Sequence, residues 1–113
     1  MRRGEVYWYD PEPVRGNEQA GRRPAVLVSR DAINHASRIV VVVPLTADRG
    51  RRLYPSDVRV TAPEGGLDHD SIALALQVRA IDRSRLGERL GRLSPETIAA
   101  IDSALAKVLD FAD

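Results

Sequence analysis

Polar and apolar positions alternate along most of this chain, in short segments separated by Pro, Gly and charged residues. Segment 5–10 is rich in aromatic residues and stops at Pro11, which predicts a first strand. A second strand is predicted at about 24–29, and segment 30–37 has room for one helical turn. The β-branched run 39–43 predicts a strand buried on both faces that ends at Pro44.

Later segments repeat the strand pattern until the last twenty residues. Val58 and Val60 flank Arg59, which is typical of a half-buried strand, and a turn is predicted at 63–66. Apolar residues alternate over 72–76, the chain is expected to continue extended over 77–82, and a short strand is predicted at about 89–93. Short strands with frequent turn residues favour a small barrel over a βαβ unit.

The C-terminal segment has helical periodicity instead. Ser94 is a hydroxyl N-cap, Pro95 suits the first helical position, and Glu96 places an acid in the first turn. Apolar residues then recur on one helical face, at Ile98, Ile101, Leu105, Val108 and Leu109. We therefore expect a mainly β fold closed by one C-terminal helix.

Length and composition narrow the class of protein. The 113 residues suit a single domain, 1–113, and no apolar stretch is long enough for a membrane span or a signal peptide. The chain has no cysteine and only two histidines, His35 and His69, so we expect no disulfide, no metal site and no cofactor. A cytoplasmic protein is the simplest interpretation.

Charge is distributed unevenly although the net charge is only +1. Residues 1–60 hold eleven arginines against seven Asp or Glu, whereas residues 61–113 hold six basic and nine acidic residues. Such asymmetry allows one basic face to hold a polyanion. The low net charge argues against non-specific coating of nucleic acid, so contact with a nucleic acid would be local.

The polar loop at 16–24 is the strongest candidate site. Two glycines, Gly16 and Gly21, allow its backbone to approach a ligand closely, and Pro24 biases Arg23 toward an extended conformation. Arg22 and Arg23 are suited to bidentate binding of phosphate or carboxylate. A loop that handles anions is one interpretation, and a solvated hairpin connection with scattered charges is the other.

Several motifs in order give the chain a resemblance to the MazF/PemK-type toxins of bacterial toxin–antitoxin systems. They are Arg3-Gly4-Glu5-Val6-Tyr7-Trp8, Gly16-x-Glu18-Gln19-x-Gly21-x-Arg23-Pro24, Val42-Val43-Pro44-Leu45-Thr46, Asp70-Ser71, Gln77-Val78-Arg79-x-Ile81-Asp82 and Leu93-Ser94-Pro95-Glu96. The resemblance implies an SH3-like small barrel with a C-terminal helix, assembled as a homodimer. It also implies metal-independent, sequence-specific cleavage of single-stranded RNA by 2′-OH attack, which leaves 2′,3′-cyclic phosphate and 5′-OH ends.

The same resemblance assigns the chemistry residue by residue. Arg23 matches the family's catalytic arginine and can neutralise a phosphorane, and Thr46 matches the catalytic threonine, whose hydroxyl can orient the 2′-OH or a phosphate oxygen. Thr46 could instead cap a turn. Glu18 is the nearest carboxylate for a general base, or it could hold the loop together by accepting backbone N–H bonds.

At some positions this chain lacks catalytic residues that branches of the family carry, and these differences reduce the number of possible mechanisms. One branch carries a catalytic arginine and aspartate where Leu74 and Leu76 stand here, and another has a histidine at the position of Asn17. Mechanisms built on those residues are excluded, which favours Arg23 with Thr46. His69 is expected in a turn without catalytic geometry, His35 on the surface, and Trp8 in the core or a subunit contact.

RNA contacts are expected from loop residues. Arginines after Thr46 could clamp phosphates and Tyr54 could stack a base, while amide side chains could read base edges. The candidates are Asn17, Gln19, Arg22, Arg49, Arg51, Arg52, Tyr54 and Gln77. A solvated charged loop remains the alternative for 49–52.

The resemblance further implies a partner, an antitoxin that lies across the active site. A groove lined by Arg22, Arg23 and Arg51 suits an acidic, flexible antitoxin segment as well as RNA. The toxin–antitoxin complex is expected to bind DNA. Two other functions share this barrel and stay open at this point: a gyrase-inhibiting toxin, and an inactive RNA-binding or autoregulatory module.

Overall fold

The computed structural model describes residues 1–10 and 22–111, and within them the chain is a curved, mainly antiparallel sheet with a C-terminal helix. The first half contains β1 (Glu5–Tyr9), β2 (Arg23–Leu27), α1 (Asp31–Ala36), β3 (Ile39–Ala47) and β4 (Asp57–Val60). The second half contains the 3₁₀ helix η1 (Glu64–Gly66), β5 (Ser71–Leu74), η2 (Ala75–Gln77), β6 (Arg79–Asp82), η3 (Arg83–Arg85), β7 (Leu86–Arg92) and α2 (Pro95–Leu109). The expected mainly β fold with a C-terminal helix is confirmed.

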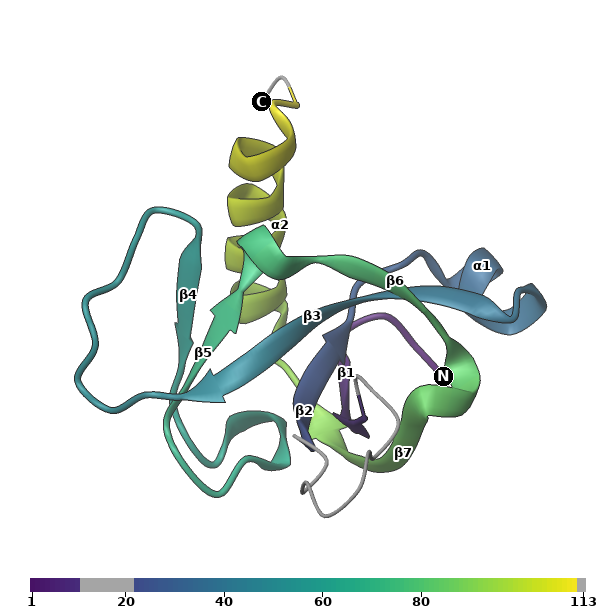
Figure 1. Ribbon diagram of the computed structural model, residues 1–113, viewed down its shortest axis with the longest axis horizontal. Helices are drawn as coiled ribbons and strands as arrows, with labels where there is room; N and C mark the ends of the chain where they lie inside the picture. Colours follow the sequence, from purple (N-terminus) through teal and green to yellow (C-terminus); the bar gives the residue numbers. More distant parts are fainter. Residues whose placement is uncertain (11–21, 112–113) are drawn as a thin grey trace, which may run out of the picture.

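Strand β3 organises the sheet, and Figure 1 shows it crossing the whole molecule from α1 to the β4–β5 hairpin. The strand order is β4-β5-β3-β2-β1-β7, and every pair is antiparallel. One edge of β3 pairs with β2. Its other edge pairs first with β6, over residues 39–42, and then with β5, over residues 45–47. This change of partner bends the sheet around the core.

The expected end of the third strand at Pro44 is wrong, because β3 continues through the proline to Ala47. Proline lacks the N–H that a ladder needs and is therefore unusual inside a sheet. Here it lies between Val42 and Leu45, where one edge of β3 has left β6 and has not yet joined β5. A residue without a donor is tolerated in that interval. The expected burial of the strand on both faces is also wrong at its start, because Ile39 is 48% exposed.

The alternating run at 72–76 is not one strand either. Strand β5 ends at Leu74, and η2 turns the chain so that β6 can pair with the other half of β3. Leu76 falls in this turn and is 71% exposed instead of buried. The last strand, β7, begins at Leu86, earlier than expected, after the turn η3.

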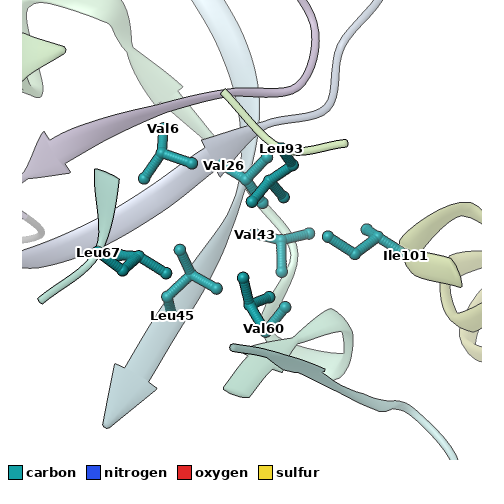
Figure 2. Close-up of a cluster of buried hydrophobic side chains, with 9 residues drawn as sticks. Val6, Val26, Val43, Leu45, Val60, Leu67, Leu93 and Ile101 are labelled. Atoms are coloured by element: carbon teal, nitrogen blue, oxygen red, sulfur yellow. The ribbon is translucent and has the colours of Figure 1, made fainter. Parts of the chain in front are cut away.

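Two buried clusters fill the inside of the curved sheet. The larger one, shown in Figure 2, brings together side chains from the sheet and Ile101 from α2. Its members are Val6, Val26, Val43, Leu45, Val60, Leu67, Ala73, Leu93 and Ile101. The second cluster contains Tyr7, Tyr9, Ala25, Leu27, Val40, Val42 and Ile81. Burial of these apolar side chains is the main favourable term that holds the fold.

Helix α2 begins as expected. The Ser94 hydroxyl accepts a hydrogen bond from the Thr97 N–H (3.2 Å), which satisfies one free donor of the first turn. A carboxylate oxygen of Glu64 accepts from the Ser94 N–H (2.9 Å) and so ties η1 to the start of the helix. Burial raises the pKa of Glu64, but the hydrogen bonds from Ser94 and Thr97 outweigh burial and lower it overall. In the described part of the chain, no helix is long and apolar enough to cross a membrane.

Candidate active-site cleft

Four strands meet at one end of the sheet, where β1 and β3 finish and β2 and β5 begin. The β1–β2 register pairs Tyr9 with Arg23, and the β2–β3 register pairs Ala25 with Pro44. Arg23 precedes Ala25 by two residues and Thr46 follows Pro44 by two, so both lie at this end of the β2–β3 pair, and both line the same cleft. The pairing of the strands therefore brings together two residues that are 23 positions apart in the sequence.

A cleft of about 880 Å³ opens at this end of the sheet. Its floor includes the buried side chains of Leu45 and Leu67. Its polar rim is strongly basic, because four arginines line it together with Thr46: Arg22, Arg23, Arg49 and Arg51. A basic cleft of this kind concentrates anions and holds them against a rigid sheet.

One wall of the cleft is the β3–β4 loop, which two carboxylates hold in place. Asp48 accepts hydrogen bonds from the Gly50 N–H (3.0 Å) and from the Arg59 guanidinium (2.9 Å). These bonds lower the pKa of the Asp48 carboxyl. Asp57, whose side chain is only 6% exposed, accepts from the Tyr54 N–H (2.9 Å) and lies 3.9 Å from the Arg51 guanidinium. Arg51 therefore stands at the cleft with its position restrained.

The opposite wall is the turn 66–70, which contacts β7. Gly66 has φ +74°, and a Cβ added there would overlap the Leu90 carbonyl oxygen, so only glycine fits at this contact. The Ser71 hydroxyl donates to the His69 carbonyl (3.0 Å), and the Asp48 N–H donates to the Asp70 carbonyl (2.8 Å). The turn is thus attached to both neighbouring strands. Asp68 and His69 line the cleft from it.

Trp8 occupies a third side of the cleft. Its indole is half-buried, and the Arg22 guanidinium lies 4.9 Å from the ring centroid. A cation over an indole face is a favourable arrangement and holds the guanidinium in one place. The interpretation of Trp8 as a core or subunit residue therefore gives way to a position on the cleft.

The arginines of the cleft differ from those elsewhere in their ion pairs. Arg22, Arg23 and Arg49 have no carboxylate within salt-bridge distance in the described part of the chain, and Arg51 has only the 3.9 Å contact with Asp57. Four other arginines pair with carboxylates: Arg3 with Asp102, Arg38 with Asp82, Arg59 with Asp48 and Arg89 with Glu5. The cleft thus concentrates positive charge that ion pairs among the described residues leave largely unneutralised.

The structure separates the predicted site residues into three groups. Those that it brings together in the cleft are Arg22, Arg23, Thr46, Arg49 and Arg51. Arg52 and Tyr54 lie further along the β3–β4 loop with the guanidinium 5.9 Å from the ring centroid, and Gln77 is exposed in η2; none of these three lines the cleft. Asn17, Glu18 and Gln19 lie outside the described residues.

Sequence reasoning missed three cleft residues: Trp8, Asp68 and His69. His69 was expected in a turn without catalytic geometry, and the turn is real, but it forms a cleft wall. A signal was available, because Asp68 and His69 directly precede the Asp70-Ser71 motif, and Trp8 ends the first motif. The sequence could not show that these three residues line the same cleft.

The chain is similar to known proteins over nearly its whole length. Residues 2–109 match the family of PemK-like, MazF-like toxins of type II toxin–antitoxin systems. Endoribonuclease MazF of Staphylococcus saprophyticus is 37% identical over 105 residues, which cover 93% of this chain and 88% of that protein.

Solved structures of similar proteins extend the match to three dimensions. An endoribonuclease in complex with its cognate antitoxin, from a mycobacterial species, has a TM-score of 0.80 at 30% identity, and the match covers 100% of this chain and 98% of that one. A MazE–MazF structure from Deinococcus radiodurans has a TM-score of 0.82 at 29% identity, over 99% and 97% of the two chains. With a family match over nearly its whole length, this chain belongs to the PemK-like, MazF-like toxins of type II toxin–antitoxin systems.

Proposed function

We propose that this endoribonuclease toxin cleaves single-stranded RNA, including mRNA, at specific sequences and without a metal ion, by attack of the ribose 2′-OH on the adjacent phosphorus. The products are a 2′,3′-cyclic phosphate and a 5′-OH end. The observation that carries this proposal is the basic cleft that Arg23 and Thr46 both line, in which the Arg23 guanidinium has no carboxylate partner among the described residues.

The reaction requires stabilisation of negative charge on a pentavalent phosphorus. The Arg23 guanidinium has a planar fork that can donate to two phosphoryl oxygens at once, and no internal ion pair competes for it in the described structure. Across the β2–β3 pair, the Thr46 hydroxyl can donate to a phosphate oxygen or accept from the 2′-OH. Both residues extend from strands, which hold them in position more precisely than a free loop would.

A proton acceptor is also needed for the 2′-OH. Arginine is a poor acceptor because its pKa exceeds about 12. We propose Glu18 for this role, on the strength of its place in the same motif as Arg23. The residues that the structure describes contain no group of three or more His, Asp and Glu side chains placed to hold a metal ion.

Binding of a longer RNA follows from the walls of the cleft. Arg22, Arg49 and Arg51 are placed to contact phosphates on either side of the scissile one. Beyond the cleft, Tyr54 is 57% exposed and can stack a base, with Arg52 beside the ring. The remaining candidates for base reading are Asn17, Gln19 and Gln77. An unpaired strand suits these contacts because its bases can turn outward.

The test uses purified protein and a defined pool of single-stranded RNA in the presence of EDTA, with the new ends mapped. We expect cleavage at one short sequence, with cyclic phosphate on one product and a 5′-OH on the other. A requirement for Mg²⁺, or 5′-phosphate ends, would contradict the 2′-OH mechanism. RNA bound but never cut would indicate an inactive binding module instead.

A homodimer is part of the proposal. Two elements that pack against each other, α2 and η2, leave apolar side chains exposed: Leu76 at 71% and Leu109 at 48%, with Phe111 at 62% just after the helix. A second copy related by two-fold symmetry can cover such a surface and extend the RNA groove. Light scattering at micromolar concentration should give the mass of two chains, and Leu76→Glu should shift the mass toward that of one. A monomeric wild type would contradict this.

The cognate antitoxin is the second proposed partner, since similar proteins are solved in complex with MazE or a cognate antitoxin. The arginines that attract RNA will equally attract an acidic, flexible peptide, which orders on binding. We therefore expect RNA and antitoxin to compete and raised salt to weaken both. Unchanged RNA affinity in the antitoxin-bound protein would rule out occupation of the cleft.

A further inference from the structure

We propose that His69 is the general acid of this cleavage, the group that protonates the 5′-oxygen as it leaves. The inference rests on the ribonuclease function proposed above and adds the residue that completes its proton transfers. Departure of an unprotonated 5′-alkoxide is unfavourable, so a positioned acid accelerates the step substantially.

The chemistry of the cleft leaves few side chains for this role. An acid must carry a proton near neutral pH and still release it readily. Arginine holds its proton too tightly, a threonine hydroxyl is also too weak an acid, and a carboxylate such as Asp68 is ordinarily deprotonated. Histidine changes its charge near neutral pH, and His69 is the one histidine on the cleft, because His35 lies exposed on α1.

The position of the ring follows from the register of the sheet. The β3–β5 ladder pairs Ala47 with Ser71, and the bond from the Asp48 N–H to the Asp70 carbonyl continues it. His69 lies in the turn two residues before Ser71, and both residues line the cleft. His69 therefore borders the same cleft as Arg23 and Thr46.

The backbone around His69 is held on every side. Its carbonyl accepts from the Ser71 hydroxyl, the Asp70 carboxylate accepts from the Ala62 N–H (2.9 Å), and Gly66 packs directly on the Leu90 carbonyl. A fixed backbone with a free side chain is what an acid needs, because the imidazole has no hydrogen bond to another described residue to break before it can act. The charged groups that surround it are Asp68 and Asp70 on its own turn, Arg49 and Arg51 on the β3–β4 loop, and Arg22 and Arg23 on and before β2.

The proposed step balances as follows. The 2′-oxygen forms a bond to phosphorus and loses its proton to a carboxylate, for which Glu18 is proposed. The bond from phosphorus to the 5′-oxygen breaks, the electron pair stays on that oxygen, and an N–H of the His69 imidazolium supplies the proton. The products are the cyclic phosphate, a 5′-OH, a protonated carboxyl group and a neutral imidazole. Proton exchange with solvent then restores the carboxylate and the imidazolium.

The experiment compares His69→Gln with His35→Gln on an RNA oligonucleotide that contains the mapped cleavage site. We expect His69→Gln to lower the cleavage rate by roughly 10²-fold or more, with circular dichroism and melting temperature unchanged, and His35→Gln to keep the wild-type rate.

A second substrate tests whether His69 acts as a general acid or only binds phosphate. In an otherwise identical RNA, sulfur replaces the bridging 5′-oxygen at the cleavage site, and the thiolate leaves without protonation. His69→Gln should cut this RNA at nearly the wild-type rate, whereas Arg23→Ala should stay slow on both RNAs. A defect of His69→Gln that persists on the sulfur substrate, or no defect on normal RNA, overturns the role of His69 and leaves the ribonuclease proposal intact. Loss of cleavage in EDTA by the wild type would instead overturn the proposed function itself.

Discussion

Two sets of arginines in this protein differ in their ion pairs. One set, outside the cleft, is paired with carboxylates: Arg3, Arg38, Arg59 and Arg89. Those of the cleft, Arg22, Arg23 and Arg49, have no such partner among the described residues. A paired guanidinium has already satisfied its charge within the chain, while an unpaired one stays available to an external anion.

The comparison identifies where function conflicts with stability. Several unpaired positive charges close together repel one another, and ion pairs would relieve that repulsion. Among the described residues, ion pairs hold four arginines outside the cleft but not Arg22, Arg23 or Arg49, as the proposed binding of a phosphate requires. Substitutions in the two groups should therefore separate activity from folding.

The largest expected effect is at Arg23. Arg23→Ala should lower the cleavage rate roughly 10²-fold or more, as when one electrostatic donor to the transition state is lost, with little change in melting temperature. Arg3→Ala is the matched change outside the cleft, because Arg3 donates to the Val28 carbonyl (2.9 Å) and pairs with Asp102. It should lower stability by about 1 kcal/mol and leave the rate of the folded protein unchanged. Near-normal activity of Arg23→Ala at unchanged RNA affinity would contradict a catalytic role for the arginines of the cleft.

A somewhat smaller loss is expected at Thr46. Removing its hydroxyl in Thr46→Ala should slow cleavage by about tenfold to a hundredfold, the equivalent of one hydrogen bond to a charged group. Thr46→Ser keeps the hydroxyl and should keep most of the activity. Single-turnover rates with saturating RNA separate this effect from binding. If Thr46→Ser were as slow as Thr46→Ala, the role of the residue would be packing and not its hydroxyl.

RNA affinity offers a third contrast between the groups. Arg49→Ala should weaken binding and reduce the slope of log affinity against log salt by about one, since one phosphate contact is lost. Arg38→Ala removes an arginine that is paired with Asp82 and does not line the cleft, and it should leave the slope unchanged. Titrations at several salt concentrations measure both. Equal slopes for the two variants would mean that Arg49 does not contact a phosphate.

The smallest effect concerns acid stability. Burial raises the pKa of Glu5, but its bonds with Tyr7, Arg2 and Arg89 outweigh burial and hold the pKa below its ordinary 4.5. A depressed pKa contributes stability that is complete above 4.5 and is lost as the pH falls further. Melting temperature should therefore drop from pH 5 to pH 3, and Glu5→Gln should reduce that drop by roughly 3 °C. An identical drop in the variant would show that Glu5 is not a source of the acid sensitivity.

Prediction from the sequence succeeded where neighbours along the chain decide the outcome. The α2 start depends on Ser94, Pro95 and Thr97, which lie within one helical turn, and the structure has that cap. Most strands were located from alternation, and the mainly β class followed. The motif that contains Arg23 also identified one side of the cleft, because its glycines, arginines and proline are neighbours in the chain.

Only the tertiary structure decided which distant residues share the cleft, because register and strand partners depend on contacts across the whole sheet. Pro44 lies within β3 because that edge of the strand changes partners there, and Leu76 is exposed because η2 turns the chain toward β6. The same pairing places His69 beside a cleft that Arg23 and Thr46 also line. Local chemistry thus determined which groups this protein carries, and the long-range register of the sheet determined which of them line one cleft.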